Sequence, residues 1–179
     1  MKSIHIKSPL KVYLAGKISK NCWRHSLVDD LRYHQWDMGP LIQSHFIYIG
    51  PFFVGCDHGC YHYPSNHGSS LTSTFGCYPE LELEKAEVAK KCRDAIAEAD
   101  LVFAYINAKD CYGTIAEIER AHTLGKRVII VFGPKIKSQT NNDMWFVTKG
   151  ACRIHHKITT KKLKKVFDLT LEEIALGLY

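Results

Sequence analysis

Three segments between residues 101 and 132 decide the fold: Leu101-Val-Phe-Ala-Tyr-Ile106, Tyr112-Gly-Thr-Ile-Ala-Glu-Ile118 and Arg127-Val-Ile-Ile-Val-Phe132. The first and third are short apolar runs rich in β-branched and aromatic residues, typical of strands covered on both faces of a parallel sheet. Between them, apolar residues recur on one face of a helix that opens at Thr114 and that Gly125 ends. This order predicts a βαβ unit, in which ligands collect at the carboxyl ends of the strands, beside the helix N-terminus.

Glu117 is predicted to lie at that place, in the first turn of the helix. Two interpretations of this carboxylate stay open. Thr114-x-x-Glu117 fits a capping box, in which the two side chains satisfy backbone donors at the helix start. Alternatively, the carboxylate performs chemistry on a ligand bound at the strand ends.

The size and composition of the chain suit one soluble domain spanning residues 1–179. It has 46% hydrophobic and 23% charged residues, values that are ordinary for a globular protein. A net charge of +6 favours an anionic ligand. Seven cysteines, the lack of a signal pattern and apolar runs too short to cross a bilayer predict a cytoplasmic protein with free thiols and no membrane partner.

The remaining segments extend the alternation of strand and helix. The expected elements are a strand at Leu10–Ala15, a helix at Trp23–Tyr33, a strand at His45–Gly50, a helix at Glu80–Ala99 and, after a basic stretch, a short helix at Leu171–Leu178. The sequence therefore predicts a single doubly wound, flavodoxin-like or Rossmann-like α/β domain, with helices on both faces of a parallel sheet.

Four pieces of the chain together resemble the nucleoside 2-deoxyribosyltransferase family, whose relatives include nucleotide N-glycosidases. They are Val12-Tyr-Leu-Ala-Gly-Lys-Ile-Ser19 with Trp23-Arg24, Ala99-Asp-Leu-Val-Phe-Ala104, Tyr112-Gly-Thr-Ile-Ala-Glu-Ile118, and Ala121 with Gly125-Lys126. The resemblance implies a compact flavodoxin-like fold, and it implies that Glu117 is a nucleophile. Such a carboxylate attacks the anomeric carbon as the base leaves, and a covalent glycosyl-enzyme forms.

The resemblance also implies substrate-binding positions. Gly16, Lys17, Ser19 and Arg24 would surround the sugar and any 5′-phosphate, since Lys17 and Arg24 suit a phosphate by charge. For Arg24 the alternative is a residue on the surface of a helix. Tyr112 and Gly113 belong to the turn before Glu117, where Gly113 would let the backbone approach a ligand or would simply make the turn.

Three further positions bear on the substrate. Where the family usually has an Asp that helps hold the sugar, this chain has Cys92, with Asp94 two residues later; Asp94 is the candidate for that role. The Gly expected shortly after the nucleophile is Glu119. Trp145 lies where some relatives place residues that complete a neighbour's site, so it is predicted to be a pocket or interface aromatic, with a core tryptophan as the alternative.

An irregular segment at about 50–79 is rich in His and Cys. Cys56, His58, Cys60 and His62 are potential metal ligands, but their spacing fits no zinc motif. We therefore expect a loop that lines the pocket, with no metal or cofactor; a metal site and a loop of ordinary packed side chains are the alternatives. In that role Asp57 and His58 would hydrogen-bond the base or protonate it as it leaves.

The leading hypothesis is an enzyme that cleaves or transfers at the N-glycosidic bond of a nucleoside or nucleotide, in a homo-oligomer. The alternatives are an NAD glycohydrolase-like enzyme and a non-catalytic nucleotide-binding or sensing module. The basic stretch from Arg153 to Lys165 could contact nucleic acid, but such a run is more often a solvated face and no RNA-binding motif accompanies it. The predicted partner is thus a small molecule rather than a nucleic acid.

Overall fold

The computed structural model of the protein describes residues 9–18, 22–31, 34, 36–52, 83–137 and 142–178. These residues form a six-stranded sheet in the order β2-β3-β1-β4-β5-β6. The elements are β1 (Leu10–Gly16), η1 (Trp23–Ser26), η3 (Trp36–Met38), β2 (Leu41–Ile42), β3 (Phe46–Gly50), α1 (Lys85–Glu98), β4 (Leu101–Ile106), α2 (Tyr112–Thr123), β5 (Arg127–Phe132), α4 (Trp145–Thr148), β6 (Arg153–His155) and α5 (Thr160–Ala175). All strand pairs are parallel except β2 with β3.

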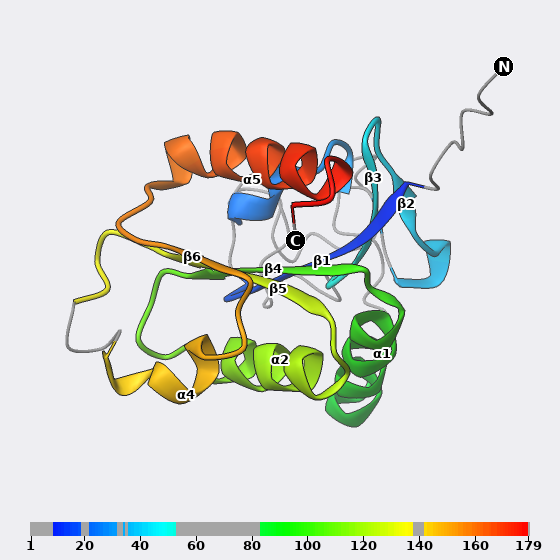
Figure 1. Ribbon diagram of the computed structural model, residues 1–179. Coiled ribbons are helices and arrows are strands. Elements are labelled where there is room, and N and C mark those ends of the chain that lie inside the picture. The colour runs from blue at the N-terminus through cyan, green and yellow to red at the C-terminus, as the bar shows by residue number, and fades with distance from the viewer. Residues whose placement is uncertain are drawn as a thin grey trace, which may run out of the picture.

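Helices cover both faces of the sheet (Figure 1). Helix α5 and the short turn η1 lie on one face, whereas α1, α2 and α4 lie on the other. The predicted doubly wound α/β domain is confirmed as a mostly parallel, Rossmann-like sheet. Its departure from an all-parallel sheet is the short edge strand β2, which runs antiparallel to β3.

The two faces of the sheet pack differently. Under α5 the core is aromatic, and Phe103 meets Phe167 edge to face with ring centroids 5.1 Å apart. On the other face Val102, Ile118 and Ile130 belong to a mainly aliphatic layer. Both β4 and β5 have buried residues along almost their whole length, because side chains that alternate between two covered faces must all be apolar.

The predicted helix at Trp23–Tyr33 is wrong over its described residues. A 3-10 turn forms at Trp23–Ser26 in place of an α-helix, and the chain then bends through Asp30, whose φ is +59°. A left-handed residue ends a helical path, and aspartate is one of the few residues that adopt it readily. The apolar positions still face the core, since Leu27 and Leu31 are both buried.

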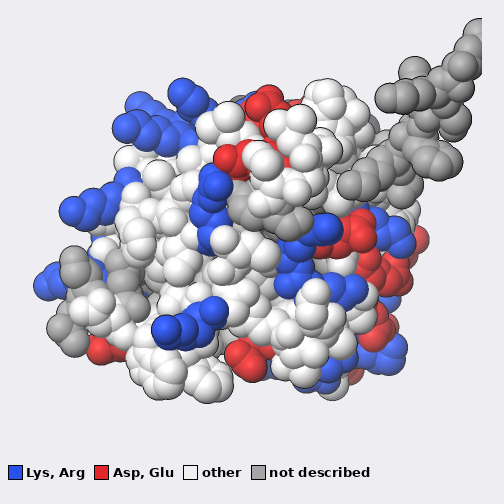
Figure 2. Space-filling view, in the orientation of Figure 1, with Lys and Arg blue, Asp and Glu red and all other residues white. Residues whose placement is uncertain are grey.

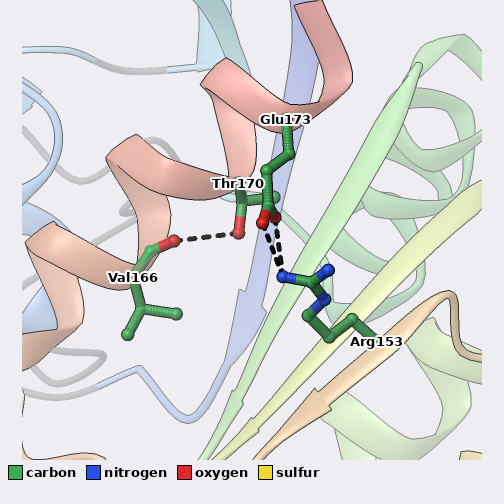
Figure 3. Close-up of polar contacts among 4 residues, drawn as sticks. All are labelled: Arg153, Val166, Thr170 and Glu173. Atoms are coloured by element: carbon green, nitrogen blue, oxygen red, sulfur yellow. Dashed lines mark hydrogen bonds and ion pairs between the residues drawn. The ribbon is translucent and has the colours of Figure 1, made fainter. Parts of the chain in front are cut away.

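Helix α5 begins well before the predicted start at Leu171, and the edge strand β6 was not predicted. Leu163, Phe167, Leu171 and Ile174 recur at helical spacing and are all buried, so the lysines among them occupy the outer face of one continuous helix. Figure 3 shows how this helix is tied to β6 and braced internally. Arg153 donates to both carboxylate oxygens of Glu173, at 2.7 and 2.8 Å, and the Thr170 hydroxyl donates to the Val166 carbonyl at 2.9 Å.

The other strands and helices agree with the sequence-based expectations in type, with shifted ends. Helix α1 occupies the described part of the predicted helix at Glu80–Ala99, and β3 corresponds to the predicted strand at His45–Gly50. Residues 53–82, which hold most of the irregular His/Cys segment, lie outside the described residues. No helix in the described part of the chain is long and apolar enough to cross a membrane.

Candidate active site

The candidate site lies where the carboxyl end of β1 meets helix α2. The chain folds back here because β1 ends at Gly16, while α2 starts at Tyr112, soon after β4 ends at Ile106. Glu117 lies in the second turn of α2, not in the first. The capping-box interpretation is wrong: the N-cap is Cys111, no side chain caps the helix, and Thr114 is a buried residue within it.

Two donors from β1 hold the Glu117 carboxylate. The hydroxyl of Tyr13 donates to Glu117 Oε1 at 2.5 Å, and the backbone N–H of Gly16 also donates to this carboxylate. Hydrogen bonds to an ionised carboxylate are among the stronger ones in proteins. A strand buried in the middle of the sheet therefore fixes the position of a carboxylate carried by the neighbouring helix.

The environment of Glu117 acts on its pKa in opposite directions. Burial raises the pKa above the usual carboxyl value because it disfavours the charged form. The Tyr13 hydrogen bond, the positive charge of Arg24 and the Gly16 N–H each lower it, and the net shift is upward. The carboxylate is thus weakly solvated and precisely oriented, as a nucleophile requires.

Arg24 is wholly buried, with 0% of its surface exposed. Its Nε donates to the Leu14 carbonyl at 2.8 Å, its Nη2 to the Gly16 carbonyl at 2.7 Å and its Nη1 to Cys22 Sγ at 2.9 Å. The guanidinium also lies 4.7 Å from the centroid of the Trp23 ring. The alternative of a surface helix residue is therefore wrong, and these contacts direct the donors of Arg24 toward the end of β1 rather than outward.

Gly16 is the point where the groups of the site converge. A Cβ atom there would lie 3.0 Å from two atoms of the Trp23 indole and 3.1 Å from the Tyr105 carbonyl oxygen. Because Gly16 has no side chain, Trp23 can pack against the end of β1. The Gly16 N–H donates to Glu117, and the Gly16 carbonyl accepts a hydrogen bond from Arg24. A glycine is thus required here by close packing.

Cys92 belongs to the site through Tyr13. The thiol on α1 is hydrogen-bonded to the Tyr13 phenol, which also donates to Glu117. Burial raises the pKa of Cys92, which keeps it a neutral thiol. The resemblance implies an Asp at position 92. This chain instead has the uncharged Cys92 thiol there, next to Tyr13, the residue that donates to Glu117.

Lys17 forms an ion pair with Asp110, and both side chains are exposed. This pair joins the loop after β1 to the loop after β4, on either side of the carboxyl ends of these strands. The pKa of Asp110 is lowered, chiefly by its hydrogen bond with Lys17. Lys17 therefore borders the site, and its ammonium is engaged by a carboxylate.

The remaining predicted positions are scattered. Asp94 faces outward on α1 and pairs with Lys90 at 2.6 Å, away from Tyr13. Tyr112 and Gly113 open α2; Tyr112 is 79% exposed, and nothing in the structure crowds Gly113. Trp145 is 61% exposed, stacking edge to face with Phe146, so the core-tryptophan alternative is wrong.

Three predicted residues, Ser19, Asp57 and His58, lie outside the described residues. Within the described ranges there is no group of three or more His, Cys, Asp or Glu side chains that could hold a metal ion. The site as described consists of one carboxylate, its phenol and amide donors, a buried guanidinium and a thiol.

Tyr13 is the site residue that sequence reasoning missed. It stands in the buried part of β1, between the apolar residues Val12 and Leu14. A buried tyrosine nearly always finds a partner for its hydroxyl, so its position near the carboxyl end of a parallel strand was the available signal. The partner itself lies 104 residues away and has no local signature.

No protein-family profile matches this chain, and no curated protein matches it. The fold defines the class: an α/β protein with a mostly parallel, Rossmann-like sheet. Its function is therefore argued from the geometry around Glu117.

Proposed function

We propose that the protein cleaves or transfers at the N-glycosidic bond of a nucleoside or nucleotide, with Glu117 as the nucleophile. The observation that supports this most directly is the pair of donors, Tyr13 and Gly16, that orient a half-buried carboxylate at the carboxyl end of the sheet. A carboxylate that forms no ion pair with any described residue and has a fixed position suits attack on a carbon atom. The resemblance of the Tyr112–Ile118 segment to the nucleoside 2-deoxyribosyltransferase family adds support.

In the proposed reaction a Glu117 carboxylate oxygen bonds to the anomeric carbon while the carbon–nitrogen bond breaks. The leaving base keeps the bonding electron pair and takes up a proton. Water, or the nitrogen of a second base, then attacks the same carbon and releases the Glu117 carboxylate. Water gives hydrolysis and a second base gives transfer, so the same residues serve either outcome.

The buried Arg24 contributes through its charge and through the loop it holds. It binds the carbonyl groups of Leu14 and Gly16, which fixes the backbone N–H that faces Glu117. Its positive charge favours the ionised carboxylate. Tyr13 keeps its proton, because burial and the nearby Glu117 charge raise its pKa well above the usual value, and it therefore remains a donor.

A base-release assay tests the proposal. Wild type and Glu117→Ala are incubated with ribo- and deoxyribonucleosides, their 5′-monophosphates and NAD, and free base is measured by chromatography. We expect release by wild type and a loss of more than about a thousandfold in the variant, as for other covalent nucleophiles. Intact-mass spectrometry of wild type during turnover should show the glycosyl adduct. Glu119→Ala, on the same helix, is the matched control and should retain activity.

A non-catalytic nucleotide-binding module is the second candidate, and Cys92 is the observation that favours it. The neutral thiol stands beside Tyr13, where the resemblance implies a carboxylate. Saturable nucleotide binding by the wild type and Glu117→Ala alike, with no base released from any compound, would establish this alternative and reject the enzyme. Release of nicotinamide alone would instead identify the NAD glycohydrolase-like reaction.

A further inference from the structure

The positive charge of the chain is concentrated in one segment. Between Asp143 and Asp168 the sequence has seven Lys and Arg residues and no Asp or Glu, whereas the whole chain has a net charge of only +6. The rest of the protein is therefore close to electrically neutral. A charge distribution this uneven creates a local field that attracts anions.

Not every cation in this segment is available. Arg153 is bound by Glu173, as Figure 3 shows, and Lys164 pairs with Asp168 at 3.4 Å. Five exposed lysines remain without an acidic partner among the described residues: Lys149, and four that lie at or just before the start of α5, Lys157, Lys161, Lys162 and Lys165. We call these four the lysine surface. Figure 2 shows Lys and Arg atoms gathered at the upper left of the molecule, over the first turns of α5 in Figure 1.

The segment that carries the lysine surface is hydrogen-bonded near the carboxyl ends of β4 and β5, the end of the sheet where the candidate site also lies. The Tyr105 hydroxyl donates to the Ile158 carbonyl at 3.0 Å, and the Ile158 N–H donates to the Phe132 carbonyl at the end of β5. The Tyr105 ring meets Trp23 with centroids 5.4 Å apart, and Trp23 packs against Gly16. The side chains of Tyr105 and Trp23 thus connect Ile158, next to Lys157 of the lysine surface, with Gly16, which donates to Glu117.

Two cations at the carboxyl end of β1 are already engaged. Arg24 gives its donors to Leu14, Gly16 and Cys22, and Lys17 pairs with Asp110. An anionic part of a ligand bound at Glu117 would therefore find unpaired positive charge at the lysine surface. Because three of the lysines lie in the first two turns of α5 and Lys157 lies just before this helix, they match an anion with several charges in a row better than a single compact one.

We infer that the lysine surface binds a chain of phosphate groups carried by the substrate whose glycosidic bond lies at Glu117. This inference rests on the proposed function and names its substrate class as a glycoside attached to two or more linked phosphates. The chain has two chemical sources, a nucleoside polyphosphate or the backbone of a single-stranded nucleic acid. Both present repeated phosphate charges to lysines, and binding to either weakens with added salt.

The first test measures binding without any reaction. Inorganic tripolyphosphate is titrated into wild type and into Lys161→Gln/Lys165→Gln by calorimetry. Removing two of four charges should weaken binding about tenfold or more at low salt. Lys85→Gln/Lys90→Gln is the matched control, because it removes two exposed lysines from α1, on the opposite face of the sheet. Equal binding by both double variants and wild type would overturn the inference.

The second test compares base release from a deoxynucleoside, its 5′-monophosphate, its 5′-triphosphate and a short single-stranded oligonucleotide. The α5 double variant should lose about tenfold in kcat/KM for the preferred phosphorylated substrate and little for the free nucleoside. A preference for the triphosphate or for the oligonucleotide identifies the source of the phosphate chain. Equal losses on all four compounds would contradict the inference.

The two tests separate the two proposals. Lysine-dependent binding of tripolyphosphate with no base released from any compound supports the phosphate-binding surface and rejects the enzyme. Base release that depends on Glu117 but not on the α5 lysines supports the enzyme and rejects the phosphate-binding surface.

Discussion

Charged side chains differ in their exposure to solvent between the two ends of the parallel sheet. At the carboxyl end, Arg24 is wholly buried and Glu117 is held by Tyr13 and Gly16. At the amino end, charged side chains lie in the open, around a groove of about 720 Å³ between α5 and the strand starts. Its lining includes Asp100, Arg127, Lys164 and Asp168.

This difference indicates where function lies. Burying a charge is costly unless its partners are fixed, whereas an exposed ion pair costs little and contributes little. A buried guanidinium and a half-buried carboxylate at the same end of the sheet should therefore reduce the stability of the fold there. We therefore expect substitutions at the carboxyl end to change both stability and activity, and matched substitutions at the amino end to change neither by much.

Arg24→Met should have the largest effect. It removes three hydrogen bonds and leaves the Leu14 and Gly16 carbonyl groups without their donors in a buried place, which should cost about 3–5 kcal/mol in the free energy of unfolding. Urea denaturation followed by circular dichroism measures this. The control is Arg127→Met at the amino end, where the loss should stay below about 1 kcal/mol.

Similar losses for the two arginine variants would contradict the comparison. If Arg24→Met yields no folded protein, Arg24→Lys provides the second measurement. Lysine keeps the charge but cannot reproduce the three-way fork of donors, so it should still destabilise more than Arg127→Met does.

Tyr13→Phe should come next, through the ionisation of Glu117. The Tyr13 hydroxyl lowers the pKa of Glu117 against the opposing effect of burial, so its removal should raise that pKa further. Carbon-13 NMR of the Glu117 carboxyl during a pH titration measures this without a substrate. In an activity profile, the acidic limb should move to higher pH by the same amount.

Tyr48→Phe is the matched control for this prediction. Tyr48 is equally buried, but its hydroxyl donates to the Pro51 carbonyl. Both variants lose a buried hydrogen bond and should be less stable, but only Tyr13→Phe should move the titration of Glu117. A shift of the same size in both would show that Tyr13 acts through general packing.

Glu117→Gln should make the protein more stable at alkaline pH. Because burial raises the pKa of Glu117 in the folded state, folding favours the protonated carboxyl, and that contribution is lost as pH rises through the raised value. Gln imitates the protonated form, so the variant should gain about 1 kcal/mol at pH 8. The gain should vanish only as the pH falls well below the ordinary glutamate value of about 4.3, where the carboxyl group of the wild type is protonated in both states.

Glu119→Gln serves as the control in the same unfolding experiments, since it removes a carboxylate from the same helix. The stability of Glu119→Gln relative to wild type should stay the same between pH 4 and pH 8. That of Glu117→Gln should rise over this range. A Glu117→Gln protein that is no more stable than wild type at pH 8 would show that the ionised carboxylate is well accommodated, and would remove the stability argument for its function.

The sequence predicted the framework of the sheet because that framework has a local signature. The apolar runs that became β1, β4 and β5 must be buried on both faces, and α2 has a helical apolar face that ends at Gly125. The position of Glu117 near the carboxyl end of the strands followed from the same pattern.

The interior of the site could not be predicted because it depends on long-range contacts. Tyr13 and Glu117 are far apart in the sequence, and nothing near Arg24 shows that its donors turn inward to β1. The start of α5 was missed because its lysines hid the apolar spacing of Leu163 and Phe167. Local patterns thus predicted the strands better than the polar contacts between them.

Glu98→Gln at the amino end should have the smallest effect. Glu98 pairs with Lys11 at 3.3 Å, but the two side chains are 63% and 43% exposed, so solvent screens most of their attraction. Removing the carboxylate charge should cost less than about 0.5 kcal/mol in the free energy of unfolding, and added salt should reduce even this. A loss as large as that of Arg24→Met would mean that the amino end, too, depends on its charges, and burial would then no longer distinguish the candidate active site from the rest of the sheet.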